Sequence, residues 1–213
     1  MPDMELKLAQ KLGVFVNPDF LAVDTCIDIR QQMKDAPGQP MTIYDPVKQQ
    51  GGIVDDSRLT FNCNVSSTLQ STIRTQLKHI QPDLEQHFND RFATIETPVF
   101  FIYDTDHFFG LHNDDVFGRK VNITIFLNNE AADDQATLDE SSCYTGGTLT
   151  LYGLLNKPCW QQRGIPIRGQ TGMLVAYSAL LNHEVTPVQK GQRFAIVSHG
   201  RGLKTLADDR KID

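Results

Sequence analysis

The stretch from His112 to Arg193 opens with His112-Asn113-Asp114, passes through Gly146-Gly147-Thr148-Leu149, and closes with Asn182-His183-Glu184-Val185 and Arg193. Two imidazoles and one carboxylate, from His112, Asp114 and His183, can bind a single metal ion. This ligand set leaves open positions on an octahedral ion and is the set that non-haem Fe(II) oxygenases use. The pattern therefore predicts a metal site built from distant parts of the chain.

The spacing of these residues has a physical reason. Side chains two apart in an extended strand point to the same face, so His112 and Asp114 can act together at a strand end. His183 begins a second extended run, and Arg193 lies in a third, after a turn at Lys190-Gly191. We expect a hairpin that lays Arg193 alongside His183. The Arg193 guanidinium can then hold the far carboxylate of a dicarboxylate cosubstrate.

Composition limits the class of protein. The 213 residues suit a single domain, 1–213, with one sizeable core. The net charge of −6 and the scattered basic residues give no sign of nucleic-acid binding. No apolar run approaches a bilayer span, and no secretory signal is visible at the N-terminus. Four separated cysteines, which form no CxxC motif, favour reduced thiols and a cytoplasmic protein.

The two halves of the chain differ in their periodicity. Residues 1–95 mix helical and extended patterns, with Asn17 as a helix cap, Pro18 at the first helical position, and a cap at Ser66 or Ser67 before a second helix. Residues 96–200 are rich in short strands, of which Val121–Leu127 alternates most cleanly. Helices followed by many strands predict helices packed outside a β-sandwich or barrel.

At this point the chain resembles a known family. Its C-terminal half is similar to the prolyl 4-hydroxylase-like branch of the Fe(II)/2-oxoglutarate-dependent dioxygenases. The matching pieces, in order, are Tyr103, His112-x-Asp114, Leu127-Asn128, Gly146-Gly147-Thr148-Leu149, His183-Glu184-Val185 and Gly191-x-Arg193. The resemblance implies a mainly β fold with flanking helices and a double-stranded β-helix, or jelly-roll, core.

The resemblance also implies an activity. Fe(II) would be bound by His112, Asp114 and His183, and 2-oxoglutarate would chelate the iron and pair its C5 carboxylate with Arg193. Tyr103 would lie near the cosubstrate, with Leu149 and Val185 in its pocket wall. With O2, such an enzyme hydroxylates an unactivated C–H bond and releases succinate and CO2. The substrate would be a prolyl residue, a free amino acid or another small metabolite.

One position departs from the family pattern. Some members carry a tyrosine at the end of the strand before Leu127-Asn128, where it assists the C5 carboxylate. This chain has Phe126 there. We therefore expect Thr124, Tyr103 or water to assist Arg193 instead.

Other residues are candidates for the substrate side of the site. Arg119 could face the substrate entrance, although a solvated turn is an equal alternative. Trp160 could line the mouth of the barrel, and the Gly51-Gly52 loop could close as a lid. We interpret His199 as structural or exposed and the acidic loop 129–144 as a solvated connection.

Two other functions fit the residues without the resemblance. One is a cupin-like metal enzyme that does not use 2-oxoglutarate, and the other is a metal-stabilised binding module. Arg193 discriminates between the first of these and an oxygenase, because only the oxygenase needs a cation for the cosubstrate. The sequence predicts neither the target carbon nor the oligomeric state.

Overall fold

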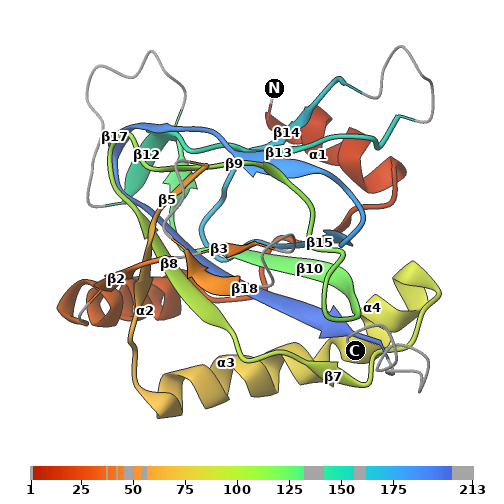
Figure 1. Ribbon diagram of the computed structural model, residues 1–213, viewed down its shortest axis with the longest axis horizontal. Helices are drawn as coiled ribbons and strands as arrows, with labels where there is room; N and C mark the ends of the chain where they lie inside the picture. The colour runs from red at the N-terminus through yellow and green to blue at the C-terminus, as the bar shows by residue number, and fades with distance from the viewer. Residues whose placement is uncertain are drawn as a thin grey trace.

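Two β-sheets face each other in the computed structural model of the chain (Figure 1). The structure describes residues 2–36, 38–41, 43–45, 50–53, 57–131, 142–155 and 162–202. The larger sheet runs in the order β1-β15-β10-β18-β8-β6-β2, with β7 also paired to β18. Its strands are β1 (Phe15–Asn17), β15 (Leu174–Ser178), β10 (Arg119–Phe126), β18 (Arg193–Arg201), β8 (Val99–Tyr103), β6 (Phe61–Cys63), β2 (Gly38–Pro40) and β7 (Thr94–Ile95).

The smaller facing sheet runs in the order β14-β13-β16-β9-β5. Its strands are β14 (Ile165–Ile167), β13 (Leu149–Leu151), β16 (His183–Val185), β9 (Phe108–His112) and β5 (Arg58–Leu59). Two small sheets complete the fold, one of β11 (Asn129–Glu130), β12 (Cys143–Gly146) and β17 (Val188–Gly191), the other of β3 (Ile43–Asp45) and β4 (Gln50–Ile53). The mainly β architecture with a jelly-roll core is confirmed.

Three of the four described helices cover the outer face of the larger sheet. In Figure 1, α2 (Val23–Asp35), α3 (Ser67–His79) and α4 (Gln81–Phe88) lie on the side away from the smaller sheet. Apolar residues of these helices, such as Met33 and Leu77, form one buried cluster with strand residues such as Ile123 and Ile196. The remaining helix, α1 (Pro2–Lys11), packs beside β14. The inner faces of both sheets are thus left for the site.

The N-terminal helix prediction was partly wrong. Asn17 does not cap α2: it ends β1, and its side chain accepts a hydrogen bond from the Asp19 N–H at 3.2 Å. Because of this local turn the helix begins only at Val23. Its N-cap residue is Ala22, which makes no side-chain hydrogen bond. The second cap was predicted correctly, since the Ser66 hydroxyl accepts from the Leu69 N–H at 3.2 Å.

The expected hairpin between His183 and Arg193 is also wrong. His183 lies on β16 of the smaller sheet, whereas Arg193 begins β18 of the larger one. Between them β17 pairs with β12, so the chain crosses from one sheet to the other instead of folding back on itself. The two residues therefore approach the same space from opposite walls.

Two further findings concern the chain as a whole. In the part of the chain that the structure describes, no helix has the length and apolar character needed to cross a bilayer. Cys26, Cys63 and Cys143 are free thiols there, and Cys159 lies outside the described residues. Burial raises the pKa values of Cys26 and Cys63 to about 11, so both remain protonated near neutral pH.

Candidate active site

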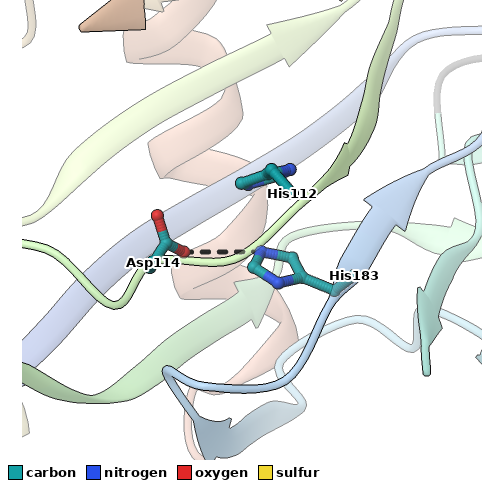
Figure 2. Close-up of side chains that lie close together, drawn as sticks. All are labelled: His112, Asp114 and His183. Atoms are coloured by element: carbon teal, nitrogen blue, oxygen red, sulfur yellow. Dashed lines mark ion pairs between the residues drawn. The ribbon is translucent and has the colours of Figure 1, made fainter. Parts of the chain in front are cut away.

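His112, Asp114 and His183 come together between the two sheets. One ligand atom from each residue lies within 4.8 Å of the others, and the Asp114 Oδ2 atom is 3.4 Å from His183 Nε2 (Figure 2). His112 ends β9 and pairs in register with His183 on β16. Asp114 lies just beyond the end of β9, where its N–H donates to the Ala179 carbonyl at 3.0 Å. Strand pairing and this turn thus gather residues that are distant in sequence.

Backbone carbonyls fix the tautomer of both histidines. His112 Nδ1 lies 2.7 Å from the Gly110 carbonyl oxygen, and His183 Nδ1 lies 3.1 Å from that of Leu181. Because a carbonyl can only accept, each Nδ1 carries the proton and donates it. Each Nε2 is therefore a free lone pair, as a metal ligand requires. The sequence did not reveal these partners.

The protonation states suit a cation. Burial, with the nearby His183, lowers the pKa of His112 to about 4, so its imidazole is neutral near pH 7. Burial also lowers the pKa of His183. For Asp114, burial acts to raise the pKa, but the hydrogen bond and charge of His199, with smaller contributions from His183 and His112, hold the pKa well below the usual range. Two neutral imidazoles and one carboxylate therefore face a common point.

A network of ion pairs holds the Asp114 carboxylate. Arg119 Nη1 lies 3.5 Å from Asp114 Oδ1, and His199 Nε2 lies 3.7 Å from Oδ2. Glu96 binds both of these groups from behind, with Oε2 at 2.9 Å from Arg119 Nη2 and 3.2 Å from His199 Nδ1. Burial acts to raise the pKa of Glu96, but the hydrogen bonds from His199 and Arg119 outweigh it and lower the pKa to about 2. Glu96 therefore stays ionised and anchors both contacts.

Arg193 forms a second polar centre in the same space. Its side chain is 1% exposed, and its Nε and Nη1 atoms have no hydrogen-bond partner. The guanidinium lies over two aromatic rings, with Cζ 4.8 Å from the Tyr103 centroid and 5.4 Å from that of Phe126. Buried donors without partners are costly, so this position suits a bound anion.

A cavity of about 620 Å³ joins the two polar centres. His112, Asp114, His183 and Arg193 all line it. So do the sequence-predicted pocket residues Tyr103, Leu149, Val185 and Arg119. Leu149 and Val185 face each other in register on β13 and β16, which places two apolar side chains in one wall. The structure thus gathers eight of the nine predicted residues, and Trp160 lies outside the described residues.

Among the expected helpers of Arg193, Thr124 and Tyr103 both line the cavity. Arg119 does line it, as expected, but its guanidinium is engaged by Glu96 and Asp114. The lid prediction for Gly51-Gly52 falls on β4, of whose side-chain surroundings nothing is described, and most of the acidic loop 129–144 lies outside the described residues.

Sequence reasoning missed several residues of the site. His199 was interpreted as structural or exposed, yet it is buried and contacts the Asp114 carboxylate. Arg58 and Tyr177 also line the cavity, and Glu96 stands behind it. Arg58 lies on a two-residue strand and Glu96 beside one, where no periodic pattern marks them. His199 could have been found, because it lies six residues beyond Arg193 on the same strand and so points to the same face.

The donor set fits the groups that the sequence implies. Two neutral imidazoles and a carboxylate suit Fe(II), whereas thiolates, which favour zinc or iron–sulfur clusters, are absent among the described residues that line the cavity. The orphaned donors of Arg193 fit one carboxylate of 2-oxoglutarate.

Comparison with known proteins gives one matching family model. Residues 99–199 match the model of the 2OG-Fe(II) oxygenase superfamily. Comparison with curated protein sequences gave no match. The ligand candidates, Tyr103 and Arg193 all fall inside the matched region.

Solved structures share the fold at low sequence identity. A prolyl-4-hydroxylase from Pseudomonas putida is similar with a TM-score of 0.63 and 15% identity, covering 96% of this chain and 100% of that chain. A prolyl hydroxylase from Trichoplax adhaerens, solved with a hypoxia inducible factor peptide fragment, gives 0.65 and 16%, covering 100% and 92%. An oxidoreductase of the 2OG-Fe(II) oxygenase family from Burkholderia pseudomallei gives 0.56 and 14%, covering 95% and 93%.

The site geometry, the family match and the shared fold agree on one chemistry, which uses Fe(II), 2-oxoglutarate and O2. Residues 99–199 match the 2OG-Fe(II) oxygenase superfamily, and the chain is a 2-oxoglutarate-dependent dioxygenase with a prolyl 4-hydroxylase-like fold.

Proposed function

We propose that this dioxygenase hydroxylates an unactivated C–H bond, with His112, Asp114 and His183 as the iron ligands and Arg193 as the partner of the cosubstrate C5 carboxylate. The observation that carries the proposal is the joint placement of the three ligand atoms and the unpaired Arg193 donors in one cavity. Fe(II) with 2-oxoglutarate and O2 supplies the oxidising power, and the cosubstrate leaves as succinate and CO2.

The residues of the chain divide the remaining work. The Gly110 and Leu181 carbonyls orient the two imidazoles, while Arg119 and His199 hold the Asp114 carboxylate. Arg193, packed on Tyr103, fixes the far end of the cosubstrate. Leu149 and Val185 place apolar surface in the wall and so exclude water from part of it. Water exclusion strengthens the ionic contacts in the site.

For the substrate we propose a prolyl residue, a free amino acid or another small metabolite. The cavity of about 620 Å³ is larger than a five-carbon cosubstrate needs, which leaves room for one such group. The relatives with the same fold include prolyl hydroxylases, one of them solved with a peptide fragment. Peptidyl and free substrates are therefore both candidates for screening. A cytoplasmic location is part of the proposal, supported by the free thiols.

The deciding experiment is a titration of the anaerobic Fe(II) protein with 2-oxoglutarate, followed by the visible metal-to-ligand charge-transfer band. We expect a saturable band in the wild type and a lost or altered band in Asp114→Ala. Arg193→Ala should keep the iron and weaken 2-oxoglutarate binding by about 100-fold, the cost of leaving a charged hydrogen-bonding partner unpaired.

Two matched variants control for general damage. Asp115→Ala removes an exposed carboxylate next to the site, and Arg168→Ala removes a partly exposed arginine outside the cavity. Both should behave as the wild type. A wild-type protein that binds Fe(II) but gives no band would contradict the proposal and favour a cupin-like enzyme without 2-oxoglutarate.

A further inference from the structure

Arg58 lies in the wall of the active-site cavity and has no role in the function proposed above. It stands on β5, opposite Phe109 of β9. Its Cζ atom is 4.1 Å from the centroid of the Phe109 ring and 4.9 Å from that of Phe101. Its guanidinium thus packs against two phenyl rings and is largely shielded from water.

Phe109 connects Arg58 to the metal site. The same ring stacks on His112, with centroids 3.6 Å apart and an interplanar angle of 21°. A group bound to Arg58 would therefore be separated from His112, a proposed iron ligand, by the ring of Phe109. A substrate held at Arg58 by one end could therefore present a carbon atom to the metal.

The charges along the cavity leave Arg58 without an assigned anion. The described residues that line it carry three guanidinium groups, on Arg58, Arg119 and Arg193, and one carboxylate, on Asp114. Glu96 pairs with Arg119, and the cosubstrate C5 carboxylate would pair with Arg193. Asp114 and the C1 carboxylate of the cosubstrate would balance the two charges of Fe(II). One positive charge then remains on Arg58 for a further ligand.

The environment of Arg58 suits a planar anion. Its Nε atom is buried without a hydrogen-bond partner. Burial lowers the pKa of the guanidinium, an effect that Tyr103 opposes through its charge and a side-chain hydrogen bond and Asp114 opposes through its charge. A guanidinium packed on aromatic rings keeps its edge available for a bidentate contact, which carboxylates make well. Such a contact would offset the cost of burying the charge.

We propose that Arg58 binds a carboxylate of the substrate, so that the enzyme selects substrates that carry this group near the carbon to be hydroxylated. Free amino acids and acidic or C-terminal peptide residues have this chemistry, whereas neutral metabolites do not. The inference rests on the proposed function, because it places the substrate in the same cavity as the iron and 2-oxoglutarate.

The test uses a small carboxylate in place of the unidentified substrate. The protein is loaded with Mn(II) and saturating 2-oxoglutarate, which occupies Arg193. Fluorine NMR then measures the paramagnetic broadening of trifluoroacetate and of the neutral probe 2,2,2-trifluoroethanol, with Zn(II) protein as the diamagnetic reference. Broadening reports closeness to the metal and requires no turnover.

In the wild type we expect saturable broadening of trifluoroacetate that exceeds that of trifluoroethanol by about fivefold or more, as a charge-assisted contact predicts. Arg58→Met, which keeps much of the apolar stem, should abolish the excess. Arg58→Lys, which keeps the charge without the planar fork, should retain part of it. Arg168→Met, outside the cavity, should leave it unchanged.

Three results would overturn the inference. Equal broadening of both probes in the wild type would show that no carboxylate site exists near the metal. An excess that survives in Arg58→Met would place the anion on the metal itself or on another cation. Loss of 2-oxoglutarate affinity in Arg58→Met, with the excess retained, would limit Arg58 to positioning Tyr103.

The charge-transfer titration separates failure of this inference from failure of the proposed function. A wild-type protein that shows the Fe(II) band with 2-oxoglutarate, but no carboxylate excess, contradicts the inference alone. A wild-type protein without the band contradicts both. Thermal unfolding of each variant confirms that the comparison is made between folded proteins.

Discussion

At the scale of single residues, the environment of Arg193 explains how the chain manages without a tyrosine at position 126. The hydroxyl of Tyr144, on β12, is buried and lacks a hydrogen-bond partner, as do Nε and Nη1 of Arg193. The positive charge of Arg193 acts on this hydroxyl and lowers its pKa, although burial raises the pKa more. A tyrosine from a different strand therefore stands beside the cation that Phe126 cannot assist.

Tyr144→Phe should separate stability from cosubstrate binding. Removing an unpaired buried hydroxyl costs the folded protein little, so we expect the free energy of unfolding to stay the same or rise. The affinity for 2-oxoglutarate should fall by about three- to tenfold, because one polar group near the anion is lost. Urea unfolding and the anaerobic charge-transfer titration measure the two quantities.

Tyr152→Phe is the matched control for this change, since the Tyr152 hydroxyl donates to Glu184 and Arg193 does not act on it. It should leave 2-oxoglutarate affinity unchanged. An unaltered affinity in Tyr144→Phe as well would exclude Tyr144 from the cosubstrate site.

The chemistry of single side chains was the basis for predicting the candidate site residues from the sequence. His112, Asp114 and His183 were predicted as ligands because only a few side chains bind Fe(II), and Arg193 was predicted as a partner because a guanidinium can hold a carboxylate. The structure places all four in one cavity. Tyr144 could not be found in this way. Its role depends on where β12 passes relative to Arg193, and the strand's own sequence does not encode that contact.

At the scale of elements, the segment after β7 supports the residues around Asp114. Glu96 is held by its N–H, which donates to the His199 carbonyl at 2.8 Å, and by its carbonyl, which accepts from the Ser198 hydroxyl at 2.8 Å. Its position against β18 is therefore fixed by the backbone. Arg119 comes from β10 and His199 from β18, so one carboxylate ties the elements around Asp114 together.

Glu96→Gln should weaken Fe(II) binding by about tenfold, in the range found when groups that orient metal ligands are removed. The amide can still hydrogen-bond but no longer offsets the charge of Arg119, so the contacts to Asp114 loosen. The charge-transfer band should shift in energy, which a purely structural role would not cause. Metal titration and the band position measure the effect, and Glu5→Gln, outside the cavity, serves as the control.

The turn between β12 and β13 leaves no room for a side chain. Gly147 has a φ of +58°, and a Cβ atom there would lie 2.9 Å from Val188 Cγ2 and 3.1 Å from Arg193 Cδ. Gly147→Ala should therefore strain the turn by about 1–2 kcal/mol and also displace Arg193, which would lower 2-oxoglutarate affinity.

Gly13→Ala separates these two effects. Gly13 also has a positive φ, of +94°, but a Cβ atom there meets nothing within 4 Å. Gly13→Ala should lower the free energy of unfolding by about 1 kcal/mol without a change in 2-oxoglutarate affinity. If both variants bind the cosubstrate equally well, Gly147 serves the turn alone.

At the scale of the whole molecule, Glu96 also links the site to stability at acid pH. Its pKa is about 2 in the folded protein, against a usual value of 4.5. Because the pKa of Glu96 is lower in the folded than in the unfolded protein, its contacts with His199 and Arg119 stabilise the fold above pH 4.5. This stability is lost as the pH falls toward 2. The contribution is roughly 3 kcal/mol.

We therefore expect the free energy of unfolding of the metal-free protein to fall less steeply with acid in Glu96→Gln than in the wild type. Urea unfolding at a series of pH values between about 5 and 2 measures the slope. If the free energy of unfolding has the same pH dependence in both proteins, the contacts of Glu96 do not stabilise the fold.

The order of strands in space was the part that the sequence could not predict. Alternation marked Val121–Leu127, which contains most of β10, correctly as a strand, because the period of two is local. Which sheet a strand joins depends on contacts far along the chain, and so the hairpin expected for His183 and Arg193 was wrong. The observed topology places His183 and Arg193 on opposite walls of the cavity, where they could bind opposite ends of one small molecule.

The crossing of the chain between these walls has a consequence for selectivity. His183 and Arg193 are joined by the short run through β17, which is itself clamped to β12. This connection helps to fix where Arg193 stands relative to His183. Under the proposed function, we therefore expect the enzyme to select among 2-oxo diacids by their length, so that one carbon fewer or one carbon more lowers the affinity.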